Sequence, residues 1–305
     1  GISACNTDDI NQVTSTETER TFTVTILMPD DKPTTRVGLE QKIDKSIELT
    51  WENGDQLELV FVQGDIKIKN TVKVKNISED RKKADFDILL PENIKIENFS
   101  LFGTYGGGGL SDENPTHAKL PINLKEASTL FDIQNRMDVM LYFKLVDIDP
   151  SNPPTSVFFH HLGSVFSIIL KNSDNTDLEN LFEARLVGVN NNENKNWAYN
   201  SDAGYGYYDL ISEEFQNIES AINYISFRAE KDNLTGGDSI TFWGWYPPLP
   251  DKNWPELKLE LRDTGASNKI SLNSKQLSAE SIVAGKVYYI YANWDGSNLF
   301  FINDP

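Results

Sequence analysis

The sequence of 305 residues has one cysteine, three histidines and few cationic side chains. A single cysteine cannot form an intramolecular disulfide and excludes metal clusters that need several thiolates. The apolar runs are far shorter than the roughly 20 residues of a membrane-spanning helix, so no such helix is expected. Lys and Arg number 28 against 46 Asp and Glu, a net charge of -18. This charge argues against nucleic acid as a partner, because phosphate binding depends on clustered Lys and Arg.

Common catalytic signatures are also missing. The histidines are His117, His160 and His161, and none of them has a metal-binding spacing such as H-E-x-x-H. Gly106–Gly109 is followed by Leu and Ser rather than Lys-Ser or Lys-Thr, so it is a hairpin tip and not a phosphate-binding loop. Carboxylates are plentiful, yet no spacing singles out a glycosidase pair. The sequence therefore predicts no enzyme, no cofactor and no metal site.

The position of the cysteine is informative. Ile2-Ser3-Ala4-Cys5 resembles the lipobox of bacterial lipoproteins, in which the thiol is acylated. The polar stretch from Asn6 to Arg20 is typical of a flexible tether. The hypothesis is that Cys5 carries the lipid, a palmitate-type acyl chain, and holds the protein on the outer membrane. The alternative is a chance free cysteine in a disordered start.

What the chain does contain is short alternating apolar segments. Thr21–Met28 alternates apolar residues with threonine and ends at Pro29, which predicts a first strand. In Ile47–Phe61 the alternation is interrupted by Asn53-Gly54, which predicts a β-hairpin with one buried face that includes Trp51. Helical periodicity is scarce, with a turn or two expected at 178–182 and 212–222. The expectation is an all-β protein of sandwiches.

Length and a proline-rich stretch suggest two folded domains. The prior of about 150 residues per domain gives two, and Asp149–Thr155 contains three prolines that neither a sheet interior nor a helix accepts. The predicted organisation is a tether over 1–20, an N-terminal β-sandwich over 21–149 and a C-terminal β-sandwich over 150–305.

Aromatic residues gather in the second half. Trp243 and Trp245 share one face of a predicted strand and are expected to fill a core. Trp294, at a predicted turn, is also expected to be a core residue of the second domain, as Trp51 is of the first. Aromatics in loops can instead stack on sugar rings. The residues considered for such glycan stacking are Trp254, Tyr205, Tyr207 and Tyr208.

Several of these segments together resemble the fimbrillin superfamily, the lipoprotein pilins and cell-adhesion proteins of Gram-negative anaerobes. The resemblance depends on Cys5 with its tether, the strand Thr21–Met28, the W-x-x-G-D element Trp51–Asp55, the region Ser156–Leu170, and the closing pattern Ala284–Tyr288 with Trp294-Asp295-Gly296. It implies two tandem transthyretin-like Greek-key β-sandwiches. It also implies a non-enzymatic, surface-anchored fimbrial subunit or adhesion lipoprotein, whose partners are other fimbrial subunits or surface ligands.

The family also implies a mode of assembly. In its pilins a protease removes the first strand after a loop arginine, and a strand of another subunit fills the exposed groove. By this resemblance Arg36 is the candidate processing site, with Arg20 a weaker one, and Asn298–Pro305 is the candidate donor. The alternatives are an uncleaved monomeric adhesin, a glycan-binding surface lipoprotein and, less favoured, a glycoside hydrolase.

Overall fold

The computed structural model describes residues 20–29, 47–202, 204, 206–216, 222–248, 256–265, 269–271 and 283–303. Within these residues the chain is nearly all β, as expected, and the exceptions are two short helical segments. The elements up to residue 148 are β1 (Thr21–Leu27), β2 (Gln56–Gln63), β3 (Ile66–Lys73), β4 (Asn76–Ile77), β5 (Lys83–Leu89), β6 (Phe99–Tyr105), β7 (His117–Lys119), η1 (Leu124–Glu126), α2 (Leu130–Asn135) and β8 (Leu141–Ile148). The later elements are β9 (Ser156–Phe158), β10 (His160–His161), β11 (Ser164–Asn172), β12 (Leu181–Asn190), β13 (Glu193–Asn194), β14 (Tyr207–Asp209), β15 (Glu214–Gln216), β16 (Tyr224–Arg228), β17 (Ser239–Tyr246), β18 (Glu256–Asp263), β19 (Lys269–Ser271), β20 (Val287–Trp294) and β21 (Leu299–Phe301).

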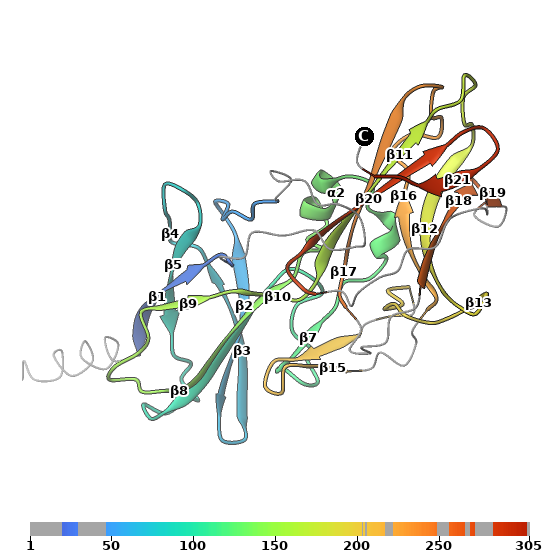
Figure 1. Cartoon of the computed structure of the whole chain (residues 1–305). Helices are drawn as coiled ribbons and strands as arrows, with labels where there is room; N and C mark the ends of the chain where they lie inside the picture. The colour runs from blue at the N-terminus through green and yellow to red at the C-terminus, as the bar shows by residue number, and fades with distance from the viewer. Residues whose placement is uncertain are drawn as a thin grey trace, which may run out of the picture.

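Two sheets enclose the first hydrophobic core. One has the order β4-β5-β1-β9 and the other β10-β8-β6-β2-β3 (Figure 1). Alternate residues of β1, β5, β2 and β6 point between them, because side chains of a strand alternate between its two faces. Val24, Phe86, Phe61 and Leu101 are fully buried there. The Pro-rich stretch after β8 leads to β9 and β10, which pair with β1 and β8 and so complete both sheets.

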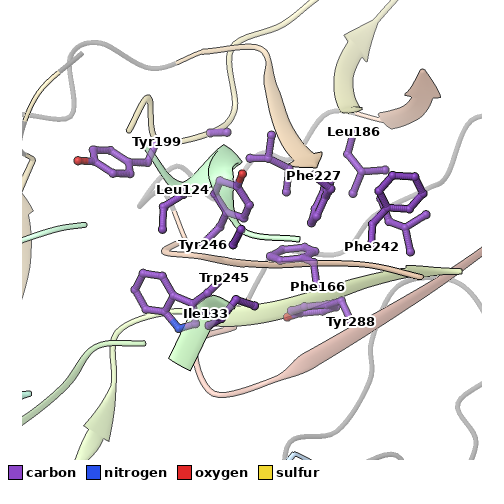
Figure 2. Packing of buried hydrophobic residues seen from close by; sticks show 14 of the residues in the cluster. Leu124, Ile133, Phe166, Leu186, Tyr199, Phe227, Phe242, Trp245, Tyr246 and Tyr288 are labelled. Atoms are coloured by element: carbon purple, nitrogen blue, oxygen red, sulfur yellow. The ribbon is translucent and has the colours of Figure 1, made fainter. Parts of the chain in front are cut away.

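Two further sheets enclose the second core. One has the order β17-β11-β20-β21, and the other joins β13, β12, β18 and β19, with β16 also paired to β12. Aromatic rings fill the space between them, and Figure 2 shows Phe166, Phe227, Phe242 and Tyr288 in this core. The ring centroids of Phe166 and Tyr288 lie 5.1 Å apart in a stacked pair.

A small fifth sheet joins the two halves of the chain. Its order is β15-β14-β7, and the register pairs Tyr208 with Ala118 and Asp209 with His117. Val60, Phe102 and Tyr142 belong to the same hydrophobic cluster as the second core, although their strands also face the first. The middle of this sheet, at Val60, Phe102 and Tyr142, is therefore covered on both faces.

The predicted hairpin at 47–61 is wrong. Residues 47–50 form no strand, and β2 pairs instead with β3 and β6. The Asn53-Gly54 turn, closed by a bond from the Asp55 amide to the Glu52 carbonyl, only redirects the chain into β2. The helical turns expected at 178–182 and 212–222 are also wrong where the structure describes them, because β12 begins at Leu181 and β15 spans Glu214–Gln216.

No helix among the described residues has the length and apolar character required to cross a membrane.

Candidate functional site: the seat of strand β1

Strand β1 lies inside its sheet and is held by strands distant in the sequence. It pairs antiparallel with β5 along its whole length, from Thr21 opposite Leu89 to Leu27 opposite Lys83. On its other side its last three residues pair in parallel with β9. The strand predicted from Thr21–Met28 is thus confirmed, ending one residue earlier. Removal of β1 would open a gap between β5 and β9, which is here called the β1 seat.

The inward face of β1 is a row of apolar side chains. Val24 and Ile26 are fully buried, Met28 is nearly so, and Phe22 packs at the end of the row with its ring centroid 6.3 Å from that of Phe99. Burial of one such side chain contributes about 1.5–3 kcal/mol. The row therefore contributes several kilocalories per mole to holding β1 in the seat.

Two carboxylates of β5 accept hydrogen bonds from the outward face of β1. Thr23 Oγ1 donates to Asp87 Oδ1 at 2.8 Å, and Thr25 Oγ1 donates to Asp85 Oδ1 at 2.6 Å. The bond from Thr23, together with the bond from Lys75, lowers the pKa of Asp87. The seat thus offers apolar pockets on one face and hydrogen-bond acceptors on the other.

Both ends of β1 are fixed by hydrogen bonds to neighbouring loops. At the start, the Arg20 guanidinium donates to the carbonyls of Pro91 and Ile94 at 3.0 and 3.1 Å. At the other end the Met28 amide donates to the Lys82 carbonyl at 2.8 Å. Arg20, the weaker of the two processing candidates, is thus already bonded to the loop that follows β5.

Trp51 packs against β1 from within the first core. Its side chain is fully buried, and Nε1 donates to the carbonyl of Ile26 at 3.1 Å. The indole stacks on Phe159, with centroids 5.3 Å apart, and meets Phe86 edge-on at 5.2 Å. The expectation that Trp51 is a core residue is confirmed. The W-x-x-G-D segment thus positions a side chain under β1, and its backbone does not pair as a strand.

Other predicted site residues lie elsewhere or outside the described ranges. Cys5, Arg36, Tyr205 and Trp254 are outside them. Tyr207 is half-buried in β14, with its ring centroid 6.1 Å from that of His117.

Tyr208 is almost fully buried, and its ring packs on Tyr142 and Phe215 with centroids 5.1 and 5.0 Å away. Its hydroxyl donates to the hydroxyl of Tyr142 at 3.1 Å. In this position Tyr208 serves the core, and glycan stacking by the loop aromatics stays a prediction.

Trp245, Trp243 and Trp294 contact the second cluster to different depths. Trp245 is buried in the core cluster, where Figure 2 shows it next to Ile133 of α2, while Trp243 is half-buried and packs against the same cluster. Both stand on the face of β17 opposite Phe242. Trp294, expected in the core, is half-buried at its edge.

The three histidines lie in two strands, His117 in β7 and the consecutive His160 and His161 in β10. His117 Nε2 lies 3.3 Å from Asp209 Oδ2 in the small sheet. Burial works against ionisation of Asp209, but amide bonds from Ile211 and Ser212 together with His117 lower its pKa. His160 lies beside the Tyr142 ring, at a centroid distance of 5.4 Å. Across the described ranges, no three His, Cys, Asp or Glu residues are grouped so that they could hold a metal ion.

Comparison with known proteins gives structural likeness without sequence likeness. No protein-family model and no curated protein matches the chain. A structure from Bacteroides uniformis, provisionally assigned as a cell adhesion protein, matches with a TM-score of 0.51 at 12% identity over 92% of this chain and 95% of that one. Another so assigned, from Bacteroides ovatus, matches with a TM-score of 0.49 at 13% identity over 93% and 96%. At these identities the likeness concerns the fold, and the chain shares the fold of the Bacteroides uniformis structure.

Proposed function

We propose that the protein is a non-enzymatic, surface-anchored adhesion or fimbrial subunit that assembles by exchange of strand β1. The observation that carries the proposal is the β1 seat: one continuous strand, the first element that the structure describes, fills a gap between β5 and β9. A strand from another subunit with the same alternation would find the same pockets and the same backbone partners, as in other cases of β-strand addition. The shared fold with a protein provisionally assigned to cell adhesion supports this proposal.

Release of β1 requires a cut after the strand, and Arg36 is the proposed position. A cut there separates the four apolar residues of the row from the rest of the chain. A cut at Arg20 leaves the strand in place. The exposed seat would then present unpaired backbone groups along β5 and a row of apolar pockets, a surface that favours pairing with another chain.

The proposed donor is the C-terminal segment Asn298–Pro305. Part of it forms β21, which is held to β20 by three residue pairs, from Ala292 opposite Phe301 to Trp294 opposite Leu299. Leu299 is buried in the second core. The donor segment must first leave its pairing with β20, which covers three residues, before it can occupy the β1 seat. In the seat, β1 pairs with β5 over seven residues, and this longer ladder favours the transfer.

The proposed anchor is acylated Cys5, which would place the folded part at the outer surface of the outer membrane. Each buried methylene of an acyl chain contributes about 0.8 kcal/mol, so two or more chains give stable attachment. Replacement of Cys5 by Ser is expected to release the protein from membranes and to abolish palmitate incorporation. Continued membrane partition of the Ser variant would contradict the anchor.

Strand exchange is tested by limited proteolysis of the folded protein with a trypsin-like protease, followed by mass spectrometry and size measurement. The expected result is a cut at Arg36 followed by oligomers that grow with concentration. The variant Arg36→Gln is expected to stay intact at this position and monomeric. Arg20→Gln removes the weaker candidate site together with its two bonds to Pro91 and Ile94, so it is expected to be cut at Arg36 like the wild type and to release β1 at least as readily. A wild-type product that is cut at Arg36 and stays monomeric would refute exchange.

A further inference from the structure

A cavity of about 270 Å³ lies where the two halves of the chain meet. It is here called the junction cavity. Met28, Leu49 and Tyr105 line it from the first half, and Val165, Trp245 and Val287 from the second. Ile133 and Met137, in and after α2, form a third wall. The segments that line the cavity are far apart in the sequence, so the cavity exists only in the folded chain.

The walls of the junction cavity are fixed by packing rather than by loops alone. Trp245 has an exposed fraction of 1% and lies against the backbone at Gly163. A Cβ at Gly163 would come within 2.3 Å of the Trp245 ring, so a residue without a side chain is required there. The amide of Gly285 donates to the Gly163 carbonyl at 2.9 Å, which joins the turn before β20 to this wall. The capping box of Thr129 and Asp132 fixes the start of α2, whose Ile133 lies next to Trp245 (Figure 2).

The chemistry of the walls selects an uncharged ligand. Most lining side chains are aliphatic or aromatic, and Tyr105 and Trp245 supply ring faces and edges. Charged groups at the cavity balance one another. Glu48, Glu52 and Lys286 line the cavity, and Arg81, which donates to Glu52 Oε2 at 2.8 Å, supplies a second cation beside these residues. Burial, Asp55 and Glu52 raise the pKa of Tyr105 to about 12, so its hydroxyl stays neutral.

We propose that the junction cavity is a binding site for a compact, uncharged, apolar molecule of one or two rings. An apolar cavity of about 150 Å³ is enough to hold a benzene ring, and this one is larger. Leu130 and Met137 line the cavity and are 36% and 40% exposed, so they form an apolar entrance through which such a molecule can pass. The proposal does not depend on strand exchange.

The test uses indole, a neutral two-ring probe, with the full chain. Isothermal titration calorimetry is expected to show saturable one-to-one binding with a negative change in heat capacity, the mark of buried apolar surface. The charged analogues tryptamine and indole-3-acetate are expected to bind at least about tenfold more weakly. Each would bring an unpaired charge either against the apolar walls or beside side chains whose charges already offset one another.

Two filling variants locate the site. Val165→Phe and Leu49→Phe add volume to half-buried lining residues and are each expected to weaken indole binding at least about tenfold. The matched control, Val146→Phe, adds the same ring on β8 at a residue that is 61% exposed and does not line the cavity, and it is expected to leave binding unchanged.

Three outcomes would overturn the proposal. They are no saturable binding of indole to the wild type, equal binding by the charged analogues, and unchanged binding by a folded filling variant. The first two outcomes are measured with the wild-type protein, so they test the proposal even where both filling variants fail to fold.

Discussion

Trp51 packs against β1 and donates a hydrogen bond to it, and its replacement gives a quantitative test of the β1 seat. Truncation of a fully buried Trp to Ala costs about 3–5 kcal/mol through lost transfer free energy and the cavity that remains. The pairs with Phe159 and Phe86 add about 0.5–1.5 kcal/mol each, and the bond to the Ile26 carbonyl adds about 1 kcal/mol. These contributions overlap, so we expect Trp51→Ala to lower the free energy of unfolding by about 4–6 kcal/mol.

Trp51→Phe separates the ring from the hydrogen bond. Phenylalanine keeps a ring in the stack but loses the Nε1 donor and part of the volume, so we expect a smaller loss, about 1–3 kcal/mol. Trp294→Ala is the matched control, because it removes the same side chain from a half-buried position at the edge of the second core. Its expected cost is about 1–2 kcal/mol, in proportion to the smaller buried area.

The assay is urea unfolding of each variant, with the slope compared to confirm that the same surface unfolds. Hydrogen exchange of the peptide that contains β1 gives a local reading, since Trp51 holds the Ile26 carbonyl directly. Faster exchange in β1 is expected for Trp51→Ala but not for Trp294→Ala. The reasoning is refuted if Trp51→Ala costs less than about 1 kcal/mol, or no more than Trp294→Ala.

Three further predictions concern two carboxyls and a glycine. Burial raises the pKa of Asp138 to about 6, although the nearby Arg136 lowers it, so the free energy of unfolding should fall as pH rises from about 4 to 6. Asp138→Asn should remove this fall. It should stabilise the protein by about 2 kcal/mol at pH 7 after allowance for solvent screening, as measured by urea unfolding across pH. For Asp209 the pH dependence of stability is reversed. Its pKa is lowered, so the stabilisation that its carboxylate provides is present above about pH 4 and is lost as pH falls. Asp209→Asn should therefore match the wild type in acid and melt earlier at pH 7. Gly103→Ala would place a Cβ 2.1 Å from the Phe143 ring and should cost about 1–3 kcal/mol, and an unchanged melting temperature would show that Phe143 can move aside.

Local pattern was enough to predict β1 and the burial of Trp51. Alternation of apolar residues with threonine specifies a strand with one buried face whatever its neighbours are, and β1 follows it. The same pattern misled at 47–61, because alternation and an Asn-Gly turn do not say which strands will pair. The apolar run Val60-Phe61 in β2 reflects burial on both faces, and this depends on partners far along the chain.

The seat itself could not be predicted from the sequence. Its far wall is β9, which pairs in parallel with β1 across more than 120 intervening residues, from Thr25 opposite Ser156 to Leu27 opposite Phe158. The sequence places Tyr208 among loop aromatics that could stack on sugars, whereas the structure shows its contact with Tyr142 of β8, which is also distant in the sequence. The helix α2 was missed because six residues show no period, although the Thr129-x-x-Asp132 capping box was a readable signal.

The small sheet β15-β14-β7 affects how the chain can fold while it is being synthesised. β7 is made early, but its partner strand β14 and the strand β15 beyond it are complete only once Gln216 has been added. At about 5–20 residues per second, the ribosome needs roughly 5–20 s to extend the chain from β7 to that point. During this interval Val60, Phe102 and Tyr142 lack the later half of the cluster that covers them. A nascent chain of this protein therefore presents an apolar surface that a chaperone can bind, and the period of exposure is determined by the order of the strands.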